Sequence, residues 1–270
     1  MRRRCMLMAA LLTLLLQVCV PLRSGSATSA SYFLYFNPDS IHNNLSGLKE
    51  AMDSFLSASG FAVTFQPFAR FQDFDREVRN EPPAFLFLPE WYLHQDGNDK
   101  RFKPFLIPVR QGAITYRKVL LVAADSTLTT DKLAATTIAM TPVGQAGLAV
   151  LDDAIFKRIG LRGKELNFIT TAKDSDALFA LALRQVKAAL VSQDNLEHVG
   201  NINPRILKTV KTLAVSDPIP LPVLCYVDGA VPAGEIDKMR KVLLAGKEGG
   251  KAARVMEMLQ IDTWRIPNAE

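Results

Sequence analysis

Short apolar runs alternate along the first part of the chain with segments in which apolar residues recur at helical spacing. The runs at residues 32–36, 61–65 and 84–88 are typical of strands buried in a sheet. The segments at 45–56 and 71–78 each have one apolar face, which predicts two helices that cover that sheet. Two strand–helix units followed by a third strand predict a mostly parallel sheet.

A second series of the same kind follows one long apolar run at residues 114–123, which we expect to be a single strand. The pattern then predicts strands at 137–140, 167–171 and 188–192, with helices at 148–159 and 174–185 between them. This repeated alternation indicates a second α/β unit.

Residues with capping preferences mark several of the expected helix ends. Asn43 or Asn44 can cap the first helix, and Gly60 and Gly160 lie where the glycine after a helix C-terminus belongs. Asp174 is a candidate N-cap of its helix. These signals support the helix limits that the periodicity gives.

The last third of the chain returns toward the first unit. Apolar runs at 206–215 and 222–227 flank Ser216-Asp217-Pro218-Ile219-Pro220, whose two prolines disfavour an uninterrupted strand or a central helix. Helices are expected at 232–244 and 251–259. The run at 114–123 and the proline-marked segment therefore form two strand-like crossings between the units.

This order predicts an α/β protein of two lobes, with two mixed sheets joined by a two-strand hinge. Lobe I would comprise residues 31–117 and 217–270, and lobe II would comprise residues 118–216. The cleft between two hinged lobes is the expected ligand site.

The loop from Thr141 to Gly147 is the first candidate for that site. It joins a predicted strand to a helix, and its Gly144 amide and the side chains of Thr141 and Gln145 can hydrogen-bond a ligand. Unpaired N–H groups at a helix start favour a carboxylate or another oxyanion. An ordinary strand-to-helix turn is the alternative interpretation.

Further candidates follow strands of lobe I or lie near the crossings. Asn37 comes after the first strand, and Trp91 and Tyr92 come after the third, where ligands gather in open α/β sheets. Hydrophobic cover at a loop edge is the alternative for the two aromatic residues. Tyr116 and Gln193 complete the expected ligand-binding set because they lie near the crossings.

The N-terminus has the three-part pattern of a secretory signal peptide, which we assign to residues 1–30. Arg2, Arg3 and Arg4 precede an apolar run that ends at Val20, and small residues follow. A retained membrane anchor and a lipidated Cys19 are the alternatives. An exported chain with one cysteine left, Cys225 in an apolar run, fits the periplasm.

Charge and isolated histidines exclude several functions. Removing residues 1–30 takes away four basic residues of 32, which leaves 28 basic against 27 acidic residues and gives no case for nucleic acid. His42, His94 and His198 are isolated, so we expect no metal site, and no phosphate-binding glycine loop or nucleophile–base pair is evident. We therefore expect no cofactor and no enzymatic activity.

Several strings, in order, resemble the phosphonate-binding family of periplasmic solute-binding proteins of ABC transporters. The resemblance extends from Tyr32 to Trp264, and the strings that carry it are Phe87–Tyr92, Tyr116–Ser126, Asp174–Leu178 and Val215–Pro220. It implies the type II periplasmic-binding fold, a monomer that captures a small phosphonate-like or phosphate-like anion, and an ABC permease in the inner membrane as partner.

One departure from the family concerns the ligand. The family carries a Ser-Thr-Ser-Gly-like string before the second-lobe helix, whereas this chain has Thr141-Pro142-Val143-Gly144. Another small anion, or a neutral polar solute held by Gln145, is therefore a contender. The expected function is solute capture for an importer, and the alternative is a periplasmic sensing module that presents its closed form to a membrane sensor.

Overall fold

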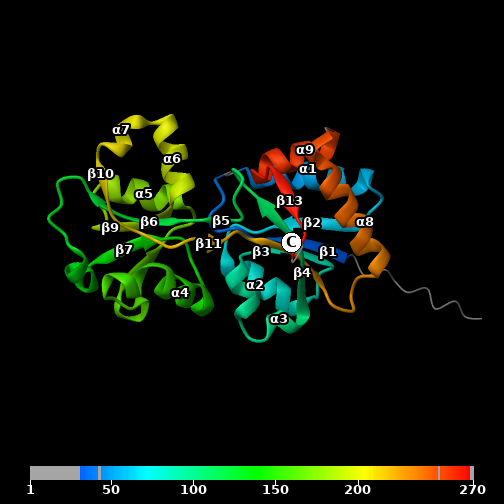
Figure 1. The fold of residues 1–270 in the computed structure, drawn as a ribbon, viewed down its shortest axis with the longest axis horizontal. Coiled ribbons are helices and arrows are strands. Elements are labelled where there is room, and N and C mark those ends of the chain that lie inside the picture. The colour runs from blue at the N-terminus through cyan, green and yellow to red at the C-terminus, as the bar shows by residue number, and fades with distance from the viewer. Residues whose placement is uncertain (1–30, 42–43, 249, 268–270) are drawn as a thin grey trace, which may run out of the picture.

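The computed structural model describes residues 31–41, 44–248 and 250–267, and its chain forms two lobes side by side (Figure 1). The predicted signal peptide and its alternatives lie outside the described residues. Within the described residues, no helix combines the length and the apolar character that crossing a membrane would need.

The sheet of lobe I has six strands in the order β13-β4-β12-β3-β1-β2. Strands β2, β1 and β3 are parallel, whereas β12 runs antiparallel to both β3 and β4, and β13 runs antiparallel to β4. The sheet is thus mixed, as expected for this fold class. Its strands are β1 (Ser31–Tyr35), β2 (Val63–Pro67), β3 (Phe85–Leu88), β4 (Phe102–Val109), β12 (Val223–Val227) and β13 (Thr263–Arg265).

Helices cover both faces of this sheet. On one face α1 (Leu45–Ala58), α8 (Ala233–Leu244) and α9 (Gly250–Leu259) enclose one apolar core, and on the other α2 (Phe71–Asn80) encloses a second core with the 3-10 turn η1 (Glu90–His94). The short α3 (Asn98–Arg101) follows η1.

The sheet of lobe II has five strands in the order β10-β6-β9-β7-β8. Strands β9, β7 and β8 are parallel, and β6 is antiparallel to β9 and β10. Its strands are β6 (Lys118–Ala123), β7 (Thr137–Met140), β8 (Asn167–Thr170), β9 (Ala188–Ser192) and β10 (Val210–Val215).

Helix α4 (Gln145–Leu151) lies on one face of the lobe II sheet, and α5 (Asp174–Ala182), α6 (Gln193–Ile202) and α7 (Pro204–Leu207) lie on the other (Figure 1). The helix that begins as α4 continues through a π-helical turn and a 3-10 turn to Gly160, whose φ of 77° is left-handed. The three segments follow one another without a gap, so the single helix predicted at 148–159 corresponds to them together.

The hinge consists of β5 (Thr115–Tyr116) and β11 (Ile219–Pro220), which pair antiparallel between the lobes. The prediction of one continuous strand over 114–123 is wrong, because the strand is interrupted at Arg117. The chain then enters the sheet of lobe II as β6. The two expected crossings are nevertheless present, and they confirm the two-lobe α/β fold.

Two local predictions at helix ends have different outcomes. The Asn44 side chain caps α1 by accepting a hydrogen bond from the Gly47 amide at 2.8 Å. Asp174 is the first residue of α5 rather than its cap; the residue before the helix is Lys173, and the Asp174 carboxylate turns toward other partners. Asn43 lies outside the described residues.

Candidate functional site

A cavity of about 270 Å³ lies between the lobes at the ends of parallel strands. Residues that follow β1 and β2 of lobe I face residues that follow β8 of lobe II across it. We call it the Lys173 cavity, and its lining comprises Asn37, Pro38, Ser40, Asn44, Leu45, Ser46, Phe68, Ala69, Ala172 and Lys173.

The Lys173 cavity offers a cation and N–H donors to a ligand. Among the described residues of its lining, Lys173 is the one charged residue, and Leu45 and Ser46 belong to the first turn of α1. The N–H groups of a first turn lack intrahelical partners and lie at the positive end of the helix dipole. Asn37, a predicted site residue, is also in the lining, and its side chain accepts a hydrogen bond from the Asp39 amide at 3.1 Å.

A buried group of polar side chains lies beside this cavity, and we call it the Lys118 cluster. The Lys118 ammonium contacts the carboxylate of Asp39 from lobe I, and it donates to Asp174 of lobe II at 3.2 and 3.4 Å. The Tyr116 hydroxyl of the hinge donates to the second oxygen of Asp39 at 2.6 Å. The predicted ligand residue Tyr116 is thus bound within the protein.

Further donors complete the cluster. Asp174 accepts from the Ser192 amide at 2.6 Å and from the Asn195 side-chain amide at 3.3 Å. The same Asn195 nitrogen donates to the Asp39 carbonyl oxygen at 3.2 Å, which is a second contact across the lobes. The cluster therefore joins lobe I to lobe II through Asp39.

The Lys118 side chain keeps its positive charge in these surroundings. Burial alone lowers the pKa of Lys118, but Asp174 and Asp39 outweigh burial and raise it above the ordinary value. Burial raises the pKa of Asp174, against the opposing effect of Lys118, and burial with the Asp39 charge raises the pKa of Tyr116 well above normal. The phenol of Tyr116 is therefore a neutral donor.

The loop from Thr141 to Gly147 faces lobe I. A Cβ built at Gly144 would lie 3.0 Å from Oε1 of Gln95 and 3.4 Å from the Phe71 ring, so lobe I side chains press on this loop. The Thr141 side chain is fully buried, and its hydroxyl has no hydrogen-bond partner among the described residues.

A smaller cavity of about 160 Å³ adjoins this loop within lobe II. Thr141, Gly144 and the exposed Gln145 line it together with apolar side chains, namely Met140, Val143, Leu148 and Phe168, and with Thr170. Three predicted site residues are thus together, in surroundings that are mostly apolar.

The other predicted residues have partners within the protein. Trp91 is buried and its ring meets Phe71 edge-on, with centroids 5.4 Å apart. The Tyr92 ring lies in the core of lobe I, and its hydroxyl donates to Asp75 at 2.8 Å. Gln193 donates along α6 to Glu197 at 2.8 Å. The structure therefore brings Asn37, but neither Tyr92 nor Gln193, to the Lys173 cavity.

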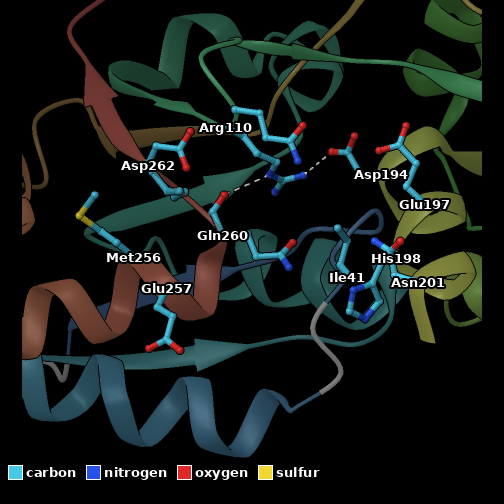
Figure 2. A pocket seen from close by; sticks show the side chains of 12 residues that line it. Ile41, Arg110, Asp194, Glu197, His198, Asn201, Met256, Glu257, Gln260 and Asp262 are labelled. Carbon is cyan, nitrogen blue, oxygen red and sulfur yellow. Dashed lines mark hydrogen bonds and ion pairs between the residues drawn. The ribbon is translucent and has the colours of Figure 1, made fainter.

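A third cavity, of about 320 Å³, lies between α6 of lobe II and the end of α9 in lobe I (Figure 2). Arg110 is ion-paired across it with Asp194 at 3.2 Å, and its Nε donates to the Gln260 carbonyl oxygen. Four carboxylates line this cavity, those of Asp194, Glu197, Glu257 and Asp262. An anion is disfavoured there, because acidic groups outnumber basic ones.

Sequence reasoning missed Asp39, Lys118, Lys173 and Asn195. The one available signal was Lys118, a charged residue that opens a strand of otherwise apolar residues. A lysine in such a strand needs a buried partner. In the part of the chain that the structure describes, no group of three or more His, Cys, Asp or Glu side chains could hold a metal ion.

Residues 31–270 match the family model described as "ABC transporter, phosphonate, periplasmic substrate-binding protein". No curated protein matches the chain. Among solved structures, the binding-protein component of an ABC phosphonate transporter from Pseudomonas aeruginosa is similar with a TM-score of 0.71 and 16% identity, over 88% of this chain and 81% of that one.

Two further structures have the same fold. PhnD1 from Prochlorococcus marinus, solved with methylphosphonate, gives a TM-score of 0.69 and 10% identity over 89% of this chain and 93% of that one. A protein of Xanthomonas citri, solved with a chloride ion, has a TM-score of 0.66 and 15% identity, over 87% of this chain and 91% of that one.

Proposed function

Because the chain belongs to the family of periplasmic substrate-binding proteins of ABC phosphonate transporters, we propose that it captures a small phosphonate-like or phosphate-like anion in the Lys173 cavity. Closure of the lobes would enclose the anion, and the closed protein would deliver it to an ABC permease in the inner membrane. The protein is a binding module in this proposal, without an enzymatic step.

The observation that carries the proposal is the composition of the Lys173 cavity. Both lobes line it, so a bound solute would contact each of them and favour the closed form. Lys173 and the first turn of α1 offer a cation and N–H donors, and no carboxylate is found among the lining residues that the structure describes. A volume of about 270 Å³ suits a small solute.

The proposal differs from the sequence-based one in the place of the anion. Helix α4, which follows the Thr141–Gly147 loop, has seven residues, and the cavity beside it is lined mostly by apolar side chains. We therefore assign the charged group of the solute to Lys173, with Asn37 as a further polar contact, and leave Gln145 outside the anion site.

Calorimetric titration of the purified protein with methylphosphonate, inorganic phosphate and sulfate tests this assignment. We expect one of them to bind, and we expect Lys173→Gln to weaken that binding by about tenfold or more, since a charged hydrogen bond contributes about 1.5 to 3 kcal/mol. Lys132→Gln is the matched control, because Lys132 is exposed and lies outside the cavity lining.

A second substitution separates the two places. Gln145→Ala should leave the affinity unchanged if the anion lies in the Lys173 cavity. A loss of affinity in Gln145→Ala with none in Lys173→Gln would instead move the solute to the Thr141–Gly147 loop and refute the assignment.

A further inference from the structure

The Lys118 cluster lies at the wall of the proposed solute cavity. Pro38 and Ser40 line the Lys173 cavity, and Asp39 between them belongs to the cluster. Likewise Lys173 lines the cavity, and the next residue, Asp174, is an ion-pair partner of Lys118. The two carboxylates therefore stand next to the space that a solute would enter.

These charges are buried, and one cation together with several hydrogen-bond donors of the chain compensates them. The exposed fraction of the side chain is 2% for Lys118, 10% for Asp39 and 0% for Asp174. A buried carboxylate is costly unless a cation or several donors compensate it. The cation here is Lys118, which reaches the interlobe space from the first position of β6.

All four carboxylate oxygens of the cluster already accept hydrogen bonds. Lys118 donates to one oxygen of Asp39, and Tyr116 donates to the other. Both oxygens of Asp174 accept hydrogen bonds from Lys118. Ser192 and Asn195 add donors to Asp174. An ammonium group from a solute would have to displace one of these donors.

We propose that Lys118 determines the charge class of the solute, because its ammonium fills the position at which Asp39 and Asp174 would otherwise bind a cationic group. The cleft then accepts small anions without an amino group and rejects their aminated analogues. This inference rests on the proposed function, since it concerns the solute of the same cleft.

The first test uses the ammonium position alone and needs no knowledge of the solute. Lys118→Ala leaves the two carboxylates facing a space of alkylammonium size. We expect butylammonium chloride, compared with sodium chloride at equal ionic strength, to raise the thermal midpoint of Lys118→Ala by about 3 °C or more and to leave wild type unchanged.

Two controls define that response. Lys157→Ala removes a lysine whose partner Asp153 is exposed, and it should show no butylammonium effect. Lys118→Ala combined with Asp39→Asn and Asp174→Asn keeps the space without the charges, and it should also show none. If Lys118→Ala does not fold, its refolding yield in the two salts gives the same readout, and no difference between the salts overturns the proposal.

The second test compares methylphosphonate with aminomethylphosphonate, which differ by one amino group. We expect wild type to bind methylphosphonate at least about tenfold more tightly, and Lys118→Ala to reverse the preference. Tighter binding of the aminated compound by wild type would overturn the proposal. If wild type binds neither compound, the butylammonium test alone decides the role of Lys118. The proposed function itself fails if wild type also binds neither inorganic phosphate nor sulfate.

Discussion

Gly147 of lobe II lies against the indole ring of Trp91 of lobe I. A Cβ built at Gly147 would be 3.1 Å from Cδ2 and 3.2 Å from Cε2 of that ring, and 2.8 Å from the Cβ of Val143. The absence of a side chain at Gly147 is therefore what lets helix α4 approach η1 so closely. Trp91, a predicted ligand contact, is packed at this interlobe contact.

We expect Gly147→Ala to hinder closure of the lobes. The added methyl group would overlap Val143 and Trp91, and such overpacking costs about 1 to 3 kcal/mol. The affinity for the solute, measured by calorimetry, should fall accordingly. Gly234→Ala in α8 is the matched control, because no atom lies within 4 Å of a Cβ at that position. An unchanged affinity in Gly147→Ala would mean that closure does not need this contact.

Trp91 should report lobe closure by its fluorescence. Its ring is buried between the lobes, whereas Trp264, the other tryptophan, lies in the core of lobe I against Phe87. Opening the lobes would expose Trp91 to water and change its emission. We expect Trp264→Phe to retain the change on adding the solute and Trp91→Phe to lose it. The reverse pattern would place the moving contact elsewhere.

Thr141→Val should not reduce stability. The Thr141 hydroxyl is buried and has no hydrogen-bond partner among the described residues, so valine removes a polar group that gains nothing from folding. We expect the free energy of unfolding in urea to stay level or rise by about 1 kcal/mol. Thr141→Ser keeps the hydroxyl and loses the methyl group, so it should be less stable by a similar amount. A destabilised valine variant would show that the hydroxyl has a partner.

Stability should decline at alkaline pH, partly through Tyr116. Burial raises its pKa well above 10.0 in the folded protein, so above the ordinary value the unfolded chain ionises while the folded chain does not. The contribution is complete below pH 10 and is lost as the pH rises beyond it. Lys118, whose pKa is also raised, loses its contribution in the same direction, above 10.5.

Tyr116→Phe isolates the tyrosine in this pH dependence. We expect the slope of unfolding free energy against pH to become less steep by up to about 1.4 kcal/mol per pH unit above pH 10. At neutral pH the variant should be less stable, because Asp39 loses a donor. Equal slopes in the two proteins would exclude Tyr116 as a titrating group.

Cys225 should be unreactive in the folded protein. It is fully buried in β12, and burial raises the pKa of its thiol, so the reactive thiolate does not form at neutral pH. In protein prepared without residues 1–30 it is the sole cysteine, and its reaction with a disulfide reagent should follow the rate of global unfolding. Rapid labelling of the native protein would contradict this expectation.

Local patterns along the chain determined the elements and the order of the lobes. Apolar runs gave β1 and β3, helical spacing gave α1, and Asn44 and Gly60 marked the ends of α1, since each of these signals acts within a few neighbouring residues. The two crossings followed from the same pattern. The interruption of the strand at Arg117 could not be seen in the apolar run, but it did not change the order of the two lobes.

Contacts between distant residues were decided only by the tertiary structure. Lys118 is 79 residues from Asp39 and 56 from Asp174, and in sequence each charge resembles a solvated surface group. The closing of one lobe on the other removes them from water together, and that burial is what makes each need the other. For the same reason the sequence could predict Trp91 and Tyr116 for the cleft, but not the contacts with Gly147 and Asp39 that the tertiary structure gives them.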